Sequence, residues 1–392
     1  MNKNDDLIKE NNDSLPSETE EKNVSSERAE EELSFDVPLT DEEKKRKKIR
    51  KILGYIGFFL INALVIAVLL IVEDKSGDTA SGKEAFNRLL SNWYYAILAF
   101  AMFFIIVTFD TIVFSLLIKK TGTKVKRSGL AIKVAYLGRY YDRITPWAIG
   151  GEPFQMAYLT RGGLKTGQSC AVTMSRHIIR FFTTAVLVIA ILIASRIATS
   201  IWVMVVAIFS VLIGLIIPSF MLICAFRPRL GERIARFCLD VLYKLHIVKN
   251  YEKNWSKLQE TVDHFLQGIK YLSSNKQVII LIAIGAIIEL FATNSVPFFV
   301  IRAFGNFEFT YWRTFVLCIF VSYASSFAPT PGGAGIAELS FYAIFAATIE
   351  DGYLFWAVLT WRLAIFYVPV FVGFIIHLFD TVGAIIKTAK NK

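Results

Sequence analysis

The sequence predicts an all-α polytopic membrane protein with about 7–8 transmembrane helices plus two re-entrant elements in an inverted-repeat arrangement. Three observations predict this class. The 392-residue chain is 54% hydrophobic with a mean hydropathy of +0.49, which is more apolar than a soluble protein of this length. Long runs with almost no charge recur along it. Two similar segments rich in proline and glycine interrupt the apolar pattern in different halves of the chain.

Apolar runs that approach the length of a membrane span account for the predicted helices. A span needs about 20 mostly apolar residues. Such runs occur at Ile52–Val72, Trp93–Leu117, Ile179–Ala194, Ile201–Phe226, Val278–Val300, Trp312–Phe327 and Leu354–His377. Because the first run begins past residue 50, we interpret it as a retained span and not as a cleaved signal peptide.

Charge is distributed unevenly along the chain, whose net charge is +10. Residues 1–43 carry 15 acidic and 4 basic side chains and have little apolar surface to bury, so we expect a disordered acidic cytosolic tail. A regulatory arm is the alternative role for this tail. Residues 44–385 then form the transmembrane domain, and residues 386–392 form a basic C-terminal tail.

Basic residues beside the spans predict the orientation. The sequence KKRKKIRK (Lys44–Lys51) precedes the first run, and KKTGTKVKR (Lys119–Arg127) follows the second. Positively charged flanks stay in the cytoplasm. We therefore expect a multi-pass protein of the cell membrane whose N- and C-termini are both cytoplasmic.

Residues 227–277 differ from the predicted spans because apolar residues recur at helical spacing between basic ones. One set is Leu230, Ile234, Phe237, Val241, Leu242 and Leu245, and the other is Trp255, Leu258, Val262, Phe265, Leu266 and Ile269. This pattern predicts a cytosolic pair of amphipathic helices that lies on the inner leaflet or packs under the bundle. Docking of a partner protein is the alternative.

The two interrupted segments share a pattern. ITPWAIGGEPF (Ile144–Phe154) and PTPGGAGIAEL (Pro329–Leu339) each contain Thr-Pro, then Gly-Gly, then Glu. The predicted orientation lets the first segment enter from the cytoplasm and the second from outside. Interrupted segments at corresponding places in two halves are typical of an inverted repeat. The alternative is that each segment is a tight loop between two full spans.

Helix breaks at membrane depth favour a binding site. Lipid cannot satisfy free backbone groups, so irregular backbone is tolerated only inside protein or beside a wet cavity. Half-helices that meet at Thr330–Gly335 would offer positively polarised N-termini to an anionic group. Glu338 is then expected to face the cavity and not the acyl chains.

Ionisable residues inside the predicted spans strengthen this hypothesis. Asp110, Glu289 and Arg362 each cost about 2.5–3.5 kcal/mol to place in the bilayer, so they are functional candidates. An ion pair between Glu289 and Arg362 is the structural alternative.

Two pairs of arginines repeat one spacing. Arg176 and Arg180 lie four residues apart at the inner end of a predicted span, and Arg139 and Arg143 repeat the spacing before the first break. Guanidinium groups bind phosphate through a planar fork. Near Glu152, the four would form an anionic-headgroup site at the inner leaflet. The alternative is that they are ordinary topology signals.

Other classes of chemistry have no signature here. Cys170, Cys224, Cys238 and Cys318 lack metal or redox spacing, and the four histidines are scattered. We therefore expect no cofactor, no metal site, no catalytic residue and no nucleic-acid partner.

At these residues the chain resembles a known family. ITPWAIGGEPFQMAYL, MSRHIIRFF and PTPGGAGIAE are similar to the transmembrane region of lysylphosphatidylglycerol synthases, which are also called flippase-like integral membrane proteins. The resemblance covers about residues 50–385. It implies importance for Gly150, Gly151, Glu152, Arg176, Arg180, Pro331, Gly332, Gly333, Gly335 and Glu338. It also implies binding or movement of anionic lipids, such as phosphatidylglycerol, its aminoacylated form or lipid-linked sugars.

Three functions are therefore weighed. The first is binding and translocation of anionic membrane lipid, to which Thr330 in the second break would also contribute. The second is lysyl transfer from lysyl-tRNA to phosphatidylglycerol, as in cationic peptide resistance. The full synthases perform it with a large cytosolic domain, and we expect that domain to be absent here, so that a separate soluble transferase would be needed. The third is a membrane scaffold. A homo-oligomer is a further expectation.

Overall fold

The chain is mainly helical in the part that the structure describes. The computed structural model describes residue 67 and residues 80–390, except residues 124, 126–128, 196–200, 245–250, 306–307, 309, 327, 347–348 and 350–351. Within these residues there are helices and no strands, which confirms the predicted all-α class. The acidic tail 1–43 and, apart from residue 67, the first predicted span lie outside the described residues.

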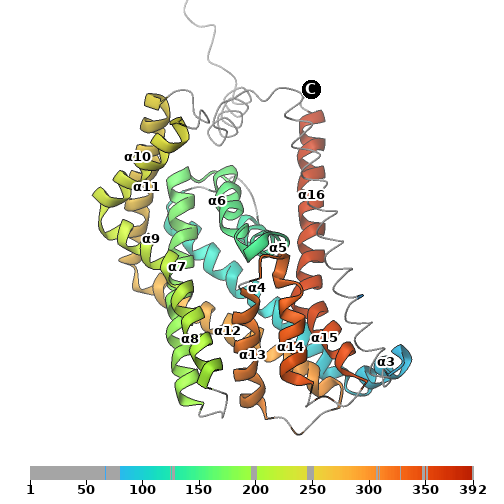
Figure 1. The fold of residues 1–392 in the computed structure, drawn as a ribbon. Helices are drawn as coiled ribbons and strands as arrows, with labels where there is room; N and C mark the ends of the chain where they lie inside the picture. Colours follow the sequence, from blue (N-terminus) through green and yellow to red (C-terminus); the bar gives the residue numbers. More distant parts are fainter. Residues whose placement is uncertain are drawn as a thin grey trace, which may run out of the picture.

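The elements follow one another in the order shown in Figure 1. They are α3 (Gly82–Ser91), α4 (Trp93–Lys120), α5 (Leu130–Ile144), η1 (Pro146–Ala148), α6 (Gly151–Arg161), α7 (Thr166–Ala194), α8 (Ile201–Gly214), α9 (Ile216–Phe226), α10 (Pro228–Lys244), α11 (Tyr251–Ser273), α12 (Lys276–Ala303), α13 (Tyr311–Ser326), η2 (Pro331–Gly333), α14 (Ile336–Phe345), α15 (Leu354–Arg362), η3 (Leu363–Tyr367) and α16 (Val368–Lys390).

One arrangement of elements occurs twice along the chain. A long helix, a broken helical hairpin and a second long helix appear as α4, α5–η1–α6 and α7, and again as α12, α13–η2–α14 and α15–η3–α16. We call Leu130–Arg161 the first hairpin and Tyr311–Phe345 the second hairpin. The two arms of each hairpin contact each other, and α4 packs along α12 more extensively than any other described pair. In Figure 1 the first hairpin lies above the second.

Four of the described helices are long and apolar enough to cross a membrane. They are α4, α7, α12 and the continuous helix Leu354–Asp380. A fifth would come from Val211–Cys224 and Arg229–Val241, which are bent by 108° relative to each other. The run Trp312–Phe327 corresponds to α13, which has 16 residues. Thus the polytopic class is supported, and the count of 7–8 spans stays a prediction.

Helix α7 begins 13 residues before the span that was predicted from Ile179. Its first half carries polar side chains that are buried against other helices, among them Ser169, Thr173 and Arg176. Because these residues interrupt the apolar run, the sequence pattern hid the start of the helix. Arg176 and Arg180 therefore lie in the middle of the helix α7, and their position relative to the end of a span stays a prediction.

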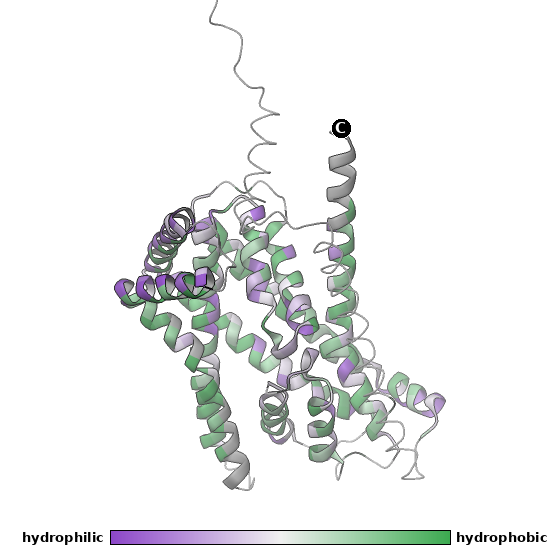
Figure 2. Ribbon diagram, turned by 45° about the horizontal axis from the view of Figure 1, so that its top comes forward, coloured by the Kyte–Doolittle hydropathy of each residue, from purple (hydrophilic) through white to green (hydrophobic). Residues whose placement is uncertain are grey.

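The predicted amphipathic pair forms two helices, α10 and α11. Helix α11 packs against α7, and α10 packs against α9 and α11. Leu239 and Ile269 are buried, whereas Phe237 and Val241 are exposed although they belong to the predicted apolar stripe. Figure 2 shows hydrophilic residues interleaved along these helices, while the long bundle helices are mainly hydrophobic.

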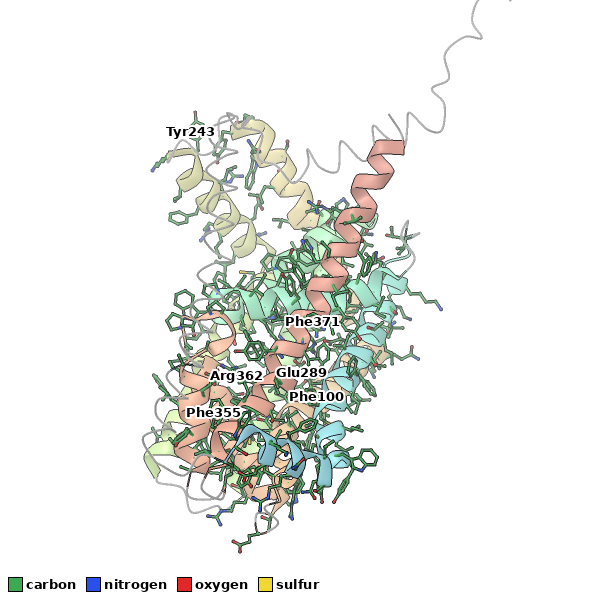
Figure 3. The ribbon with its side chains drawn as sticks, turned by 90° about the vertical axis from the view of Figure 1, so that its right-hand side faces the viewer. Phe100, Tyr243, Glu289, Phe355, Arg362 and Phe371 are labelled. Carbon is green, nitrogen blue, oxygen red and sulfur yellow. The ribbon has the colours of Figure 1, made fainter. Side chains whose placement is uncertain are left out.

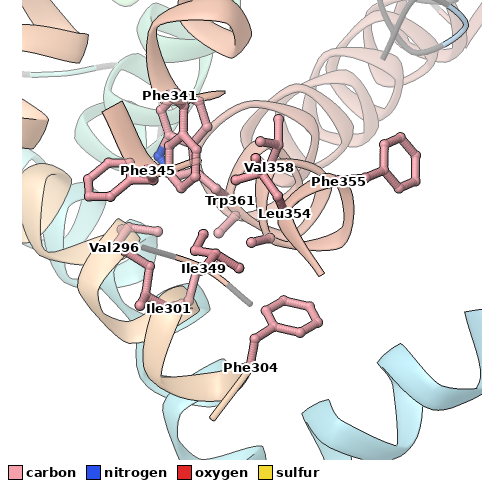
Figure 4. Packing of buried hydrophobic residues seen from close by; sticks show 14 of the residues in the cluster. Val296, Ile301, Phe304, Phe341, Phe345, Ile349, Leu354, Phe355, Val358 and Trp361 are labelled. Atoms are coloured by element: carbon pink, nitrogen blue, oxygen red, sulfur yellow. The ribbon is translucent and has the colours of Figure 1, made fainter. Parts of the chain in front are cut away.

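Each hairpin has its own hydrophobic core. Buried side chains of α4, α5, α6, α7 and α12 surround the first hairpin. Those of α12, α14 and α15 surround the second hairpin, where the Phe341 ring stacks on Trp361 with centroids 4.7 Å apart. Figure 4 shows Phe341, Phe345 and Trp361 together in this second core. The cores hold the hairpins in place, so the breaks are positioned by packing.

Candidate functional site

The two helix breaks have nearly the same backbone conformation. Thr145 and Thr330 are extended, with φ, ψ of −104°, 146° and −98°, 151°. A proline follows each, and then Trp147 (φ 53°, ψ 13°) matches Gly332 (φ 60°, ψ 20°). The N–H of Ala148 donates to the Thr145 carbonyl at 3.2 Å, and Gly333 donates to the Thr330 carbonyl at 3.1 Å. The repeat seen in the sequence is therefore also present in the backbone.

The two Gly-Gly pairs are not equivalent in space. Gly332 and Gly333 occupy the left-handed positions that Trp147 and Ala148 fill in the first break. Gly150 and Gly151 serve close packing instead, because a Cβ at Gly151 would overlap the Asp142 carboxylate. That carboxylate accepts the Gly151 N–H at 2.8 Å. Matching the two segments by Gly-Gly alone misaligns them.

The two breaks lie against each other. The turn η1 contacts η2, and α5 also contacts η2. In Figure 1 the hairpins approach from opposite ends of the bundle, and their turns meet between them. The predicted site residues Thr330, Pro331, Gly333 and Gly335 all belong to the second break or border it. Residues about 185 positions apart in sequence therefore share one region.

A network of buried and half-buried charges borders this region. Asp110 on α4 forms ion pairs with Arg139 on α5 and with Arg176 on α7, one through each carboxylate oxygen. The Arg176 guanidinium also lies over the Phe114 ring at 5.0 Å. Asp110 thus fixes arginines from two different helices. A buried carboxylate needs such partners, because an unpaired charge inside the bundle would be strongly disfavoured.

The network continues through α12 and α6. Glu289 accepts from Arg139 at 3.0 Å and from Arg180 at 3.1 Å. Arg180 also lies 3.6 Å from Glu152, and that carboxylate is 2.7 Å from His177 Nδ1. Carboxylates and cations therefore alternate across five helices, with Arg139 and Arg180 each shared between two acids.

A second ion pair lies at the second break. Glu338 is 3% exposed and Arg362 is 4% exposed, and they pair with each other. Arg362 also donates to the Gly332 carbonyl at 3.1 Å, and Glu338 accepts the Gly335 N–H at 2.7 Å. Both residues of this pair thus tie helices to the broken backbone. The prediction that Glu338 faces a cavity is not met in this conformation.

The alternative ion pair between Glu289 and Arg362 is wrong. Glu289 pairs with Arg139 and Arg180, while Arg362 pairs with Glu338. Both residues are labelled in Figure 3, at mid-height of the bundle. Which acid an arginine meets depends on how the helices are rotated about their axes, and the sequence does not specify this.

The repeat extends to these charges. In each half, a glutamate in the first turn after the break lies next to an arginine of the following long helix: Glu152 beside Arg180, and Glu338 beside Arg362. The long helix before each hairpin supplies an acid to the site, the buried Asp110 or the half-buried Glu289. Arg139 and Arg143 belong to the first hairpin alone, so the two halves are unequal in positive charge.

Several guanidinium N–H groups in the site are buried without an acceptor. They are Arg139 Nε, Arg143 Nε, Arg180 Nε and Arg362 Nη2. Arg143 has no carboxylate within ion-pair distance among the described residues. A small cavity with room for about one water molecule lies beside Asp110, Arg176, Arg180 and Glu289. The site thus has spare donors and little free space.

Two residues of the site were not among the predicted ones. His177 lies between Arg176 and Arg180 in sequence and pairs with Glu152, and Asp142 lies between Arg139 and Arg143 and binds the start of α6. Both lie between arginines that are four residues apart on a helix, and this spacing could have identified them as site residues. In the described part of the chain, no cluster of three or more His, Cys, Asp or Glu residues could hold a metal ion. The side chains that the described site brings together are guanidinium, carboxylate and imidazole groups.

Comparison with known proteins agrees with this architecture. A "UPF0104 membrane protein" of Archaeoglobus fulgidus is 27% identical over 251 residues, which cover 62% of this chain and 74% of that protein. No solved structure matches the chain. The family described as "Lysylphosphatidylglycerol synthase TM region" matches residues 52–373. The chain belongs to this family.

Proposed function

We propose that the protein binds an anionic lipid within the bundle and moves its headgroup between the two leaflets of the cell membrane. The observation that carries this proposal is the set of buried guanidinium N–H groups that have no acceptor. A buried donor without a partner costs about 1–3 kcal/mol, so such groups persist where a ligand supplies the acceptor. Phosphate oxygens are the acceptors that match a guanidinium fork.

The ion pairs give this binding a way to change the conformation. Arg180 is held by Glu289 and Glu152, and the adjacent cavity holds about one water molecule. A headgroup therefore enters only when the helices separate and a phosphate replaces one carboxylate. Because the two hairpins reach the breaks from opposite ends of the bundle, separation on either side would expose the site to a different leaflet.

The family context supports a lipid as the ligand. The matching family is described by an enzyme that makes an aminoacylated phosphatidylglycerol. Phosphatidylglycerol, its lysyl form and lipid-linked sugars all carry a phosphate beside long acyl or isoprenoid chains. The charged network would recognise the phosphate common to all of them.

A reconstitution experiment tests the proposal. The purified full chain is placed in vesicles of phosphatidylcholine and phosphatidylglycerol that contain a trace of fluorescent phosphatidylglycerol, and a membrane-impermeant quencher is added. We expect quenching of the inner-leaflet fraction in vesicles that contain the protein, and slower quenching with Arg180→Gln. Arg161→Gln is the matched control, because Arg161 is exposed at the base of the first hairpin. No transfer of phosphatidylglycerol, its lysyl form or a lipid-linked sugar would contradict the proposal.

Lysyl transfer is distinguished by product analysis. The chain is expressed in a host that makes no lysyl lipid, and total lipid is extracted. Under the proposed function we expect no new lysylphosphatidylglycerol. Its appearance without a second protein would assign enzymatic activity to this chain.

A further inference from the structure

Arg143 occupies an unusual electrostatic position at the end of α5. It is in the last turn before the first break, and its Nε is buried without an acceptor. The charges that act on it are the like charges of Arg139 and Arg362 and the opposite charges of Asp142 and Glu289, none of which forms an ion pair with it among the described residues. Like charges held together in a poorly screened interior repel each other. An anion bound between them would remove this repulsion.

Arg362 supplies a second donor at the same junction. Its Nε pairs with Glu338 and its Nη1 donates to Gly332, but its Nη2 is buried with no acceptor. The side chain is more than nine-tenths buried, so water in bulk does not satisfy this group. Because Gly332 belongs to η2 and α5 contacts η2, Arg362 and the end of α5 meet at the junction of the two breaks.

Apolar side chains border the junction on the exposed side. Trp147 and Ile149, in the first break, are 57% and 63% exposed. Leu339, one residue after Glu338, is exposed as well. Buried cationic donors next to exposed large apolar side chains match a molecule with a phosphate and hydrocarbon chains.

We infer that Arg143 and Arg362 form a phosphate subsite at the junction of the two helix breaks, which takes the phosphate of an anionic lipid such as phosphatidylglycerol. This inference rests on the proposed function for the identity of the ligand as a lipid. The shared chemistry is a phosphate oxyanion held between one guanidinium from each repeat. Binding there joins the first hairpin to the second break. The network around Glu289 is a separate set of ion pairs, so the subsite adds a contact that the ion-pair network does not contain.

Binding measurements on the detergent-purified full chain test the subsite. The unfolding temperature is followed while phosphatidylglycerol, phosphatidylcholine or inorganic phosphate is added. We expect phosphatidylglycerol to raise it and phosphatidylcholine to leave it unchanged. Arg143→Gln should lower the apparent affinity for phosphatidylglycerol about tenfold or more, because one charge-assisted hydrogen-bond donor is lost. Arg143→Lys keeps the positive charge but lacks the planar guanidinium fork. Its affinity for phosphatidylglycerol should lie between those of Arg143→Gln and the unaltered protein.

The controls make each outcome decisive. Arg161→Gln should bind phosphatidylglycerol like the unaltered protein, and size-exclusion profiles without lipid show whether the Arg143 variants fold. Equal affinity in Arg143→Gln and the unaltered protein would overturn the subsite. A stabilisation by inorganic phosphate that equals that by phosphatidylglycerol would overturn the lipid as its source. Lipid transfer in vesicles is measured separately. If Arg143→Gln binds phosphatidylglycerol as tightly as the unaltered protein and still transfers lipid, the subsite is wrong and the proposed function stands.

Discussion

At the scale of single residues, the site is built from arginines shared between carboxylates. Arg139 and Arg180 each contact two acids, so no single carboxylate holds either arginine alone. Burying so many charges is costly unless every charge is compensated. The arrangement is understandable if a ligand of the same charge displaces one carboxylate from its arginine. The arginine then keeps an anionic partner throughout.

The pair Glu338–Arg362 allows a residue-scale prediction. Removing one partner of a buried ion pair costs about 3–5 kcal/mol, because the other charge is left uncompensated. We expect Arg362→Met to lower the unfolding temperature strongly. Arg362→Met combined with Glu338→Gln should lower it less than the sum of the single changes. Thermal unfolding of the detergent-purified variants measures this.

A surface pair provides the control for that prediction. Arg236 and Glu232 lie 3.6 Å apart with largely exposed side chains, and exposed pairs contribute about 0–1 kcal/mol. Glu232→Gln, which removes the pair but leaves Arg236 over the Trp255 ring, should therefore change the unfolding temperature little. Strictly additive effects of the Arg362 and Glu338 substitutions would show that the two side chains do not interact as the structure has them.

Gly332 allows a second prediction at this scale. Its φ is 60°, and a Cβ would overlap the Phe366 ring, so Gly332→Ala meets both backbone strain and a clash. Gly122 has a φ of 72° with no atom within 4 Å of a Cβ, so Gly122→Ala meets the strain alone, about 1–2 kcal/mol. We expect a clearly larger loss of thermal stability for Gly332→Ala. Equal losses in the two variants would contradict the packing of η2 against η3.

At the scale of elements, the two breaks can be tested as structural equivalents. Ala148 (φ 54°) and Gly333 (φ 69°) occupy matching places, but alanine is strained there and glycine is not. We expect Ala148→Gly to stabilise the protein slightly, by about 1 kcal/mol at most, since relief of strain exceeds the added chain entropy. Gly333→Ala should destabilise it, because its Cβ would also lie 2.9 Å from the Ser325 carbonyl oxygen.

Unfolding temperatures of both variants check this exchange. The two substitutions are the reverse of each other at equivalent positions, so the unfolding temperature should change in opposite directions. If Ala148→Gly destabilised the protein as much as Gly333→Ala, the two turns would not share one backbone geometry in solution.

The sequence could predict that these elements exist, and it could not predict how they interact. Proline and glycine mark each break locally, so Pro146 and Pro331 were sufficient to place it. The pairing of Glu338 with Arg362 depends on the rotation and depth of α14 and α15, which only packing determines. The start of α7 was hidden for a related reason: its polar first half is buried by other helices, which a search for apolar runs cannot detect.

At the scale of the whole molecule, helix lengths argue that the hairpins do not cross the membrane. Helix α6 has 11 residues and α14 has 10, which at 1.5 Å per residue gives about 15–17 Å against a hydrocarbon core of about 30 Å. We therefore expect each hairpin to enter and leave on one side, with its break inside. If the repeat of elements around α4 and α12 is an inverted one, the two entrances lie on opposite sides.

Cysteine labelling tests this arrangement in a variant whose native cysteines are replaced. Single cysteines are introduced at Arg161, at the base of the first hairpin, and at Arg313, at the base of the second, both of which are exposed. We expect a membrane-impermeant thiol reagent to label position 313 in intact cells and position 161 only in inverted vesicles, because basic flanks keep the first hairpin's ends in the cytoplasm. A third cysteine replaces Ile149 in the first break. If α5 and α6 were full spans joined by a loop, position 149 would be labelled from outside. Labelling of position 149 from outside as fast and as complete as that of position 313, with position 161 labelled from the cytoplasm, would contradict the re-entrant hairpin, whereas slow or partial labelling is expected if the site opens to each leaflet in turn.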